Sequence, residues 1–209
     1  LFEGVATGDA DGYARMADRP AAVLLHLGPG LGNGLANLHN ARKGHTPVVN
    51  IVGDHATYHK QYDAQLESDI ETVARNVSTW IRTSASVEEV AADAADAVAV
   101  ASGPPAQIAT LILPADVSWS EGGEPAAPVA PAQPAPVDAD AVAAIAAVLQ
   151  GDEPAALFVG GRACRADALV DASRIVNTTG AKLLAETFPA RIERGAGRVP
   201  VDRLAYLAE

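Results

Sequence analysis

The sequence predicts an α/β protein in which a parallel sheet is flanked by helices. Short apolar runs of strand length alternate with segments that have the spacing of helices, which is typical of strands joined by helical crossovers. These runs are apolar throughout, as expected for strands with both faces buried. A proline-rich break then separates two such patterns, so we expect a second α/β unit after the first.

Four strands are predicted in the first pattern, with helices between them. Gly28-Pro29-Gly30 is expected as a turn after the first strand, leading into a helix over residues 32–43. Ser86, followed three residues later by Glu89, predicts a capping box that opens an alanine-rich helix ending near Gly103. The predicted strands cover residues 23–27, 48–52, 77–83 and 107–113.

The composition changes at Glu121, where a stretch rich in proline and alanine begins. Such a stretch is a semi-extended linker. Beyond it Asp138 is expected to cap a helix that ends at Gln150. The pattern then predicts strands over 155–159 and 181–185 and a helix over 165–177. We therefore predict a first domain over residues 1–120, a linker over 121–137 and the start of a Rossmann-like α/β domain over 138–209.

Charge and cysteine content exclude several classes of protein. The formal net charge of −11 over 209 residues favours neither nucleic acid nor an anionic membrane surface as a partner. The single cysteine, Cys164, excludes an internal disulfide and multi-cysteine metal sites, as expected in a reducing cytoplasm. Because the chain opens in mid-pattern at Leu1 and stops at Glu209 before a full sheet, we expect a fragment whose first domain lacks its first strand.

The generic motifs of nucleotide and hydrolase sites do not occur. The glycines at 28, 30 and 32 satisfy no register of the dinucleotide fingerprint, and no lysine follows a glycine as in a phosphate-binding loop. His55 and His59 have helical spacing, but no glutamate or cysteine accompanies them at ligand spacing. No metal site is therefore predicted in this chain.

One longer pattern is more specific. Glu3 stands eight positions before the Asp11 of Asp11-Gly12-Tyr13-Ala14-Arg15, and Gly28-Pro29-Gly30 is followed by Asn33. This pattern resembles the pyrimidine-binding domain of the thiamine diphosphate enzymes, the family of acetolactate synthases, benzoylformate decarboxylases and pyruvate oxidases. The second unit resembles the start of the family's middle domain. The resemblance covers nearly the whole chain and is closest to the acetolactate synthase large-subunit-like group.

The resemblance implies roles for four residues. Glu3 would be the carboxylate that hydrogen-bonds ring N1′ of thiamine diphosphate, and Pro29 and Asn33 would lie near that cofactor. His26 would act on the substrate, as in the benzoylformate decarboxylases. Structural alternatives stay open: Glu3 as a helix-start charge, Asn33 as a helix N-cap and His26 as a hydrogen-bonded core residue.

The resemblance implies decarboxylation of a 2-oxo acid with carboligation, a transferase activity of branched-chain amino acid biosynthesis. Three departures from the synthase pattern, at Gly53-Asp54, at Asp63-Ala64-Gln65-Leu66-Glu67 and at Thr79, concern the substrate pocket. The alternatives are a decarboxylase of the benzoylformate type and a catalytically silent homologue that binds or regulates a partner.

Cofactors and partners follow from the same resemblance. Thiamine diphosphate is expected, with Mg²⁺ bound by a missing C-terminal domain, since the chain contains no Gly-Asp-Gly; the sequence leaves FAD open. A small 2-oxo acid is the expected substrate, and a second copy of the chain is expected to meet this one across the active site.

Overall fold

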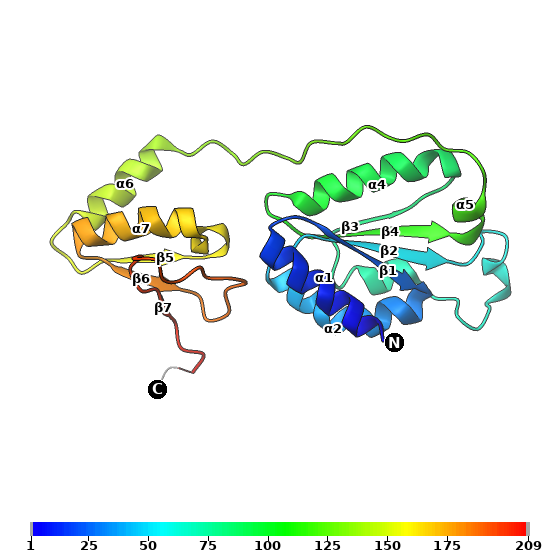
Figure 1. Ribbon diagram of the computed structural model, residues 1–209, viewed down its shortest axis with the longest axis horizontal. Coiled ribbons are helices and arrows are strands. Elements are labelled where there is room, and N and C mark those ends of the chain that lie inside the picture. The colour runs from blue at the N-terminus through cyan, green and yellow to red at the C-terminus, as the bar shows by residue number, and fades with distance from the viewer. Residues whose placement is uncertain (1, 208–209) are drawn as a thin grey trace. The chain divides into compact units, whose positions relative to one another are not determined.

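The computed structural model describes residues 2–207, and the chain divides into two compact units, residues 1–134 and 135–209 (Figure 1). Each unit contains a sheet whose strands all run parallel, with helices packed on it. The predicted α/β fold is therefore confirmed. No helix among residues 2–207 has both the length and the apolar character needed to cross a membrane.

The sheet of the first unit has the strand order β1-β2-β4-β3. Its strands are β1 (Ala21–His26), β2 (Val48–Asp54), β3 (Trp80–Thr83) and β4 (Ile108–Pro114). The helices are α1 (Glu3–Ala17), α2 (Leu27–Lys43), α3 (Ile70–Ala74), α4 (Val87–Ser102) and α5 (Ala115–Trp119), with a short 3-10 helix η1 (Lys60–Tyr62). The central strands β2 and β4 are paired along their whole length, from Val48 opposite Ile108 to Asp54 opposite Pro114.

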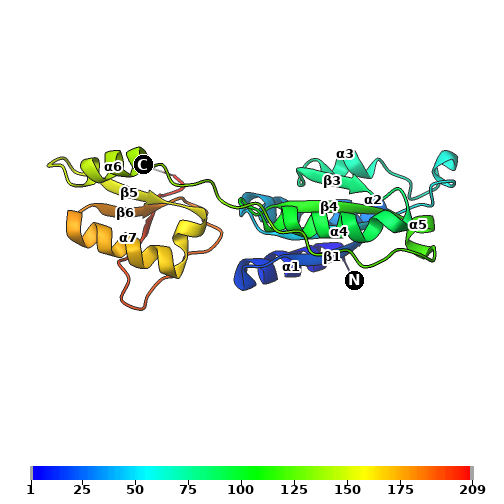
Figure 2. The same cartoon turned by 90° about the horizontal axis from the view of Figure 1, so that it is seen from above.

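Helices cover both faces of this sheet, but unequally. Helices α1, α2 and α3 lie on one face and α4 lies on the other, as the edge-on view of the sheet in Figure 1 shows for α1, α2 and α4. Figure 2 looks onto the face that α4 covers. The larger core lies under α1 and α2, where Leu31 and Leu38 meet Leu25 and Val52. The smaller core under α4 consists mainly of alanines packed on β2 and β4.

Burial of both strand faces was wrongly predicted for β1. Residues on one face of β1 are buried, whereas Leu24 on the other face is 73% exposed. The reason is its place in the sheet: β1 is an edge strand, and α4 packs on β2, β3 and β4. Alternating burial is what an edge strand with one covered face shows.

The predicted turn at Gly28-Pro29-Gly30 is also wrong, because helix α2 begins at Leu27, directly after β1. Leu27 adopts a φ of 58°, so a single left-handed residue redirects the chain from strand to helix. Pro29 is tolerated as the third helical residue because the first N–H groups of a helix have no intrahelical partner. Asn33 consequently lies inside the helix and is not its N-cap.

The second unit has the strand order β5-β6-β7. Asp138 caps its first helix as predicted, since its carboxylate accepts the backbone N–H of Asp140 at 3.0 Å. Residues 122–138, which lead into it, form neither helix nor strand. The elements are α6 (Ala139–Leu149), β5 (Ala156–Val159), the 3-10 helix η2 (Gly161–Cys164), α7 (Ala166–Thr179), β6 (Lys182–Ala185) and β7 (Asp202–Arg203).

Candidate functional site

Three of the predicted site residues meet where α1 begins and β1 ends. Glu3 is the first residue of α1, His26 is the last residue of β1, and Asn33 lies in the second turn of α2. The Asn33 amide donates a hydrogen bond from Nδ2 to Glu3 Oε2 at 3.0 Å. Pro29 is exposed on the first turn of α2 and makes no polar side-chain contact, because its side chain is a hydrocarbon ring.

Gly30 lies between these side chains. A Cβ atom at Gly30 would be 3.3 Å from Glu3 Oε1 and 3.4 Å from His26 Cβ. The absence of a side chain therefore lets the first turn of α2 approach the glutamate closely. The result is a small cradle with a carboxylate oxygen on one side and an imidazole-bearing residue on the other.

The surroundings of Glu3 favour its ionised form. The hydrogen bond from Asn33 lowers the pKa of the Glu3 carboxyl, and its own backbone N–H and the nearby His26 act in the same direction. Glu3 therefore stays a carboxylate at lower pH than an ordinary glutamate. Because Asn33 engages Oε2, Oε1 is the oxygen that faces Gly30 and is placed to accept a proton from a ligand.

The packing of α1 on α2 positions Glu3. Asn37 donates from Nδ2 to the carbonyl oxygen of Gly4 at 2.6 Å. Thr7 Oγ1 lies within hydrogen-bond distance of the carbonyl oxygen of Gly34, at 3.2 Å, and also of those of Glu3 and Gly4 in its own helix. A Cβ atom at Gly34 would lie only 2.7 Å from Thr7 Cγ2. We call this contact, formed by Gly4, Thr7, Gly34 and Asn37, the α1–α2 seam.

Thr7 and Asn37 were not predicted as part of the site. The pattern that could have found them is the spacing of Asn33 and Asn37, which puts two amides on one face of α2. The quoted Asp11-Gly12-Tyr13-Ala14-Arg15 segment has a related role. Arg15 pairs with Asp11 at 2.7 Å and donates to the Asn40 carbonyl oxygen at 3.0 Å, which ties the other end of α1 to α2.

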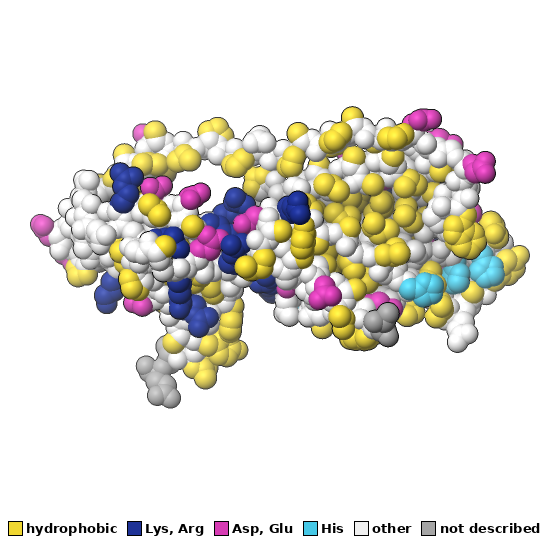
Figure 3. All heavy atoms as spheres, viewed as in Figure 1, with side chains coloured by type: hydrophobic (Ala, Val, Ile, Leu, Met, Phe, Trp, Pro, Cys, Tyr) yellow, Lys and Arg dark blue, Asp and Glu magenta, His cyan; other side chains and the backbone are white. Residues whose placement is uncertain are grey.

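Histidine side chains gather at the end of the first unit toward which its strands point (Figure 3). The strand register explains this, because His26 pairs with Gly53, two residues before His55. The ring of His55 in turn lies 5.4 Å from that of His59, measured between centroids. Within residues 2–207, no three histidine, cysteine or acidic side chains converge as metal ligands would.

The residues present are suited to the pyrimidine end of thiamine diphosphate. An aminopyrimidine needs a carboxylate at one ring nitrogen and a surface without side chains against which the ring can lie. Glu3 supplies the first, and the absence of a side chain at Gly30 lets this carboxylate lie close against the first turn of α2.

Comparison with protein families agrees with this geometry. Residues 1–74 match the family described as "Thiamine pyrophosphate enzyme, N-terminal TPP binding domain". These residues include α1, β1, α2 and β2, and therefore Glu3, His26, Gly30 and Asn33.

Two relatives and one solved structure extend the match. "Putative acetolactate synthase large subunit IlvX" of Mycobacterium tuberculosis is 62% identical over the whole chain, which spans 40% of that relative. "Benzoylformate decarboxylase" of Pseudomonas aeruginosa is 33% identical over 58% of the chain and 23% of the relative. A solved "putative thiamin diphosphate-dependent enzyme" from Mycobacterium smegmatis is 29% identical, with a TM-score of 0.82 over 90% of this chain and 37% of that one.

The chain thus spans about two fifths of the length of the relative that it matches over its whole length. The family match covers the helices and strands that bring Glu3, His26 and Asn33 together. The structural match covers 90% of the chain. Residues 1–74 therefore match, in sequence and in fold, the N-terminal TPP binding domain of the thiamine pyrophosphate enzymes.

Proposed function

We propose that this chain supplies the pyrimidine-binding half of a thiamine diphosphate site. The enzyme would decarboxylate a small 2-oxo acid and join the product to a second 2-oxo acid molecule. The observation that carries the proposal is the Glu3 carboxylate, held by Asn33 through Oε2 and facing the side-chain-free surface of Gly30 through Oε1. When bound, thiamine diphosphate supplies the nucleophilic carbon that attacks the oxo group and the ring that takes up the electrons left after carbon dioxide departs.

The chain's own residues hold and move protons in this proposal. Glu3 Oε1 holds the proton at the pyrimidine nitrogen, which is the role of a positioned general acid–base group. Asn33 keeps that carboxylate in place and ionised. His26, exposed at the end of β1, is placed to exchange a proton with the substrate, because an imidazole can both donate and accept near neutral pH.

A specific observation favours a second candidate, a decarboxylase of the benzoylformate type that does not ligate. His26 follows Leu25 at the end of the first strand, as the resemblance to those decarboxylases implies, and a named relative of that class is 33% identical over 122 residues. Product analysis separates the two, because carboligation gives an acetohydroxy acid and simple decarboxylation gives an aldehyde.

Two further parts of the proposal concern what surrounds the chain. We propose that another domain holds Mg²⁺ and the diphosphate, and that a second copy of the protein supplies this domain. Glu3 and His26 are both accessible at one end of the first unit, where such a domain could meet them. We also propose a cytoplasmic setting, which agrees with the single cysteine, Cys164.

The decisive experiment replaces Glu3 by Gln in a protein that carries this chain together with the diphosphate-binding domain. We expect Glu3→Gln to slow C2 proton exchange of bound thiamine diphosphate by on the order of 10²-fold, the scale for loss of general acid–base catalysis. Proton NMR at saturating cofactor measures this rate without interference from weaker binding.

Glu88→Gln is the matched control. Glu88 also lies in the first turn of a helix, and its hydrogen bond with Ser86 also lowers its pKa, but it belongs to α4 on the opposite face of the sheet. We expect Glu88→Gln to leave the exchange rate unchanged. Equal rates for Glu3→Gln and the unmodified protein would overturn the proposed role of the chain and favour the catalytically silent homologue.

A further inference from the structure

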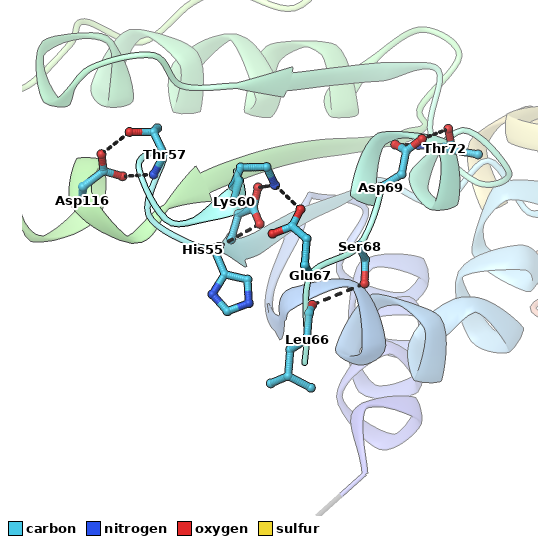
Figure 4. Close-up of polar contacts among 10 residues, drawn as sticks. His55, Thr57, Lys60, Leu66, Glu67, Ser68, Asp69, Thr72 and Asp116 are labelled. Atoms are coloured by element: carbon cyan, nitrogen blue, oxygen red, sulfur yellow. Dashed lines mark hydrogen bonds and ion pairs between the residues drawn. The ribbon is translucent and has the colours of Figure 1, made fainter. Parts of the chain in front are cut away.

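The loop of residues 55–69, which follows β2, is tied down at both of its ends. Near its start, Thr57 donates to Asp116 of α5 from its backbone N–H at 3.0 Å and from Oγ1 at 2.5 Å. At its end, Asp69 caps α3 by accepting the backbone N–H of Thr72 at 3.0 Å. Figure 4 shows both of these anchors.

Lys60 forms a third anchor in the middle of the loop. Its Nζ lies 2.6 Å from Asp54 Oδ2 and 2.7 Å from Glu67 Oε1 (Figure 4). The side chains of Asp54 and Glu67 are only 7% and 15% exposed, so Lys60 holds two largely buried carboxylates together. Burial disfavours the charged form of Lys60 and so lowers its pKa. The hydrogen bonds to Asp54 and Glu67 have the larger combined effect, so the pKa of Lys60 is raised overall.

The same anchor determines where His55 lies. Asp54 accepts the backbone N–H of His55 through Oδ1 at 2.7 Å while its Oδ2 binds Lys60. The Nε2 atom of His55 is shielded from solvent and has no hydrogen-bond partner among residues 2–207. A buried ring nitrogen without a partner costs free energy, so the position of the imidazole depends on the anchored backbone.

The loop touches the candidate site through the first turn of α2. A Cβ atom at Gly28 would overlap Oγ of Ser68, so the end of the loop packs directly on this turn. Gly30, two residues further along the same turn, faces Glu3 Oε1. On the other side His26 pairs with Gly53, next to Asp54. The 55–69 loop therefore adjoins the side chains assigned to the reaction.

We propose that Lys60 is a positioning residue: by joining Asp54 to Glu67 it fixes the 55–69 loop, and with it the His55 imidazole, as the wall of the site that contacts the 2-oxo acid. This inference rests on the proposed function. Lys60 itself does not touch the reacting atoms.

The chain offers a matched control for a test of Lys60. Arg82 also bridges two carboxylates, at 2.7 Å to Asp93 and 2.8 Å to Asp96, and its side chain is exposed to the same degree as that of Lys60. This bridge joins β3 to α4 and belongs to the other face of the sheet. The variants are therefore Lys60→Met, which removes the cation, Lys60→Arg, which retains it, and Arg82→Met as the control.

The first readout is amide hydrogen exchange along the chain. Lys60→Met leaves two carboxylates close together without a cation, so we expect exchange in residues 55–68 to rise by about tenfold or more. Lys60→Arg should restore protection, and Arg82→Met should leave this loop unchanged. Unaltered protection of the loop in Lys60→Met, or an equal rise throughout the first unit, would overturn the pinning of the loop by Lys60.

The second readout separates positioning from a purely structural role. In a protein that carries this chain with the diphosphate-binding domain, we expect Lys60→Met to lower kcat/KM for the 2-oxo acid by about tenfold, mainly through KM. C2 exchange of the bound cofactor, which depends on Glu3, should stay within about twofold. Unchanged kcat/KM despite a mobile loop, or an equal loss in Arg82→Met, would overturn the inference.

The two proposals fail in distinguishable ways. If Glu3→Gln leaves C2 exchange unchanged, the proposed function fails, while hydrogen exchange in residues 55–68 still decides whether Lys60 pins the loop. If Glu3→Gln slows C2 exchange as expected and Lys60→Met alters neither the loop nor KM, the proposed function stands and the role of Lys60 is refuted.

Discussion

Gly30 and Gly32 give a direct test of the cradle, because both lie inside α2 and only one faces Glu3. A Cβ atom at Gly32 would meet nothing within 4 Å, whereas one at Gly30 would lie 3.3 Å from Glu3 Oε1 and 3.4 Å from His26 Cβ. Replacing either glycine by alanine removes the same backbone freedom from the unfolded chain. Any difference between the two variants therefore comes from the contact with Glu3 and His26.

The magnitudes follow from these distances. Gly32→Ala should stabilise the first unit by about 0.5–1 kcal/mol, the gain for alanine over glycine in a helix. In Gly30→Ala the new methyl group must move Glu3 Oε1 by about 0.5 Å to reach an ordinary separation of 3.5–4 Å. A side-chain carboxylate can rotate away at little cost, so we expect the melting temperature of Gly30→Ala to remain at or slightly above that of the unmodified chain.

Activity should respond differently from stability. A misplacement of about 1 Å at a reacting group can cost up to 10²-fold, so a shift of half that size predicts a loss of about tenfold in C2 exchange for Gly30→Ala. Gly32→Ala should exchange at the unmodified rate. The assays are thermal unfolding and proton NMR of bound thiamine diphosphate. Equal exchange rates in the two variants would show that Gly30 does not form part of a cofactor cradle.

Three other predictions use the same site and sheet. Asn33→Leu removes the hydrogen bond that lowers the pKa of Glu3, so a ¹³C NMR titration should show the Glu3 pKa rising toward its ordinary range. The acidic limb of the pH–rate profile should then move to higher pH. An unchanged titration would assign the lowered pKa to other groups. His26→Ala should reduce turnover of a 2-oxo acid. Its melting temperature should stay constant, because His26 is exposed. A fall of several degrees in the melting temperature, with turnover per folded molecule intact, would mean that His26 is a structural histidine. The 209-residue chain should sediment as larger than a monomer because edge strand β1 exposes Leu24. The variant Leu24→Lys should reduce this self-association. Identical sedimentation of the variant and the unmodified chain would place the self-association contact elsewhere.

The sequence predicts the layered fold well because its strands are long apolar runs bounded by glycine and proline. Strand β4, for example, is expected over residues 107–113 and spans Ile108–Pro114. Edge position is a property of the whole sheet and has no local pattern, so the exposure of Leu24 was not predictable. Similarly, Gly28-Pro29-Gly30 suggests a turn, but tertiary packing holds Leu27 left-handed and lets the helix begin there.

The candidate site was predictable as a set of residues and not as a set of contacts. Glu3 and Asn33 were identified from a resemblance between patterns, but their hydrogen bond spans 30 positions and depends on how α1 packs on α2. Lys60 was not identified at all. Its partners stand six residues before it and seven after it in irregular chain, where no periodicity relates them.

The α1–α2 seam has a consequence for how such a protein can change over evolutionary time. Asn37 and Thr7 bond to backbone carbonyl oxygens of the opposite helix, and these acceptors are retained in every substitution. The close approach of the two helices also depends on Gly34, where a Cβ atom would lie against Thr7. A mutation at Gly34 that spread the helices would move Asn33 relative to Glu3 and so alter the proton affinity of the carboxylate without touching it. Variants selected for a different working pH should therefore accumulate changes along this seam while Glu3 itself is retained.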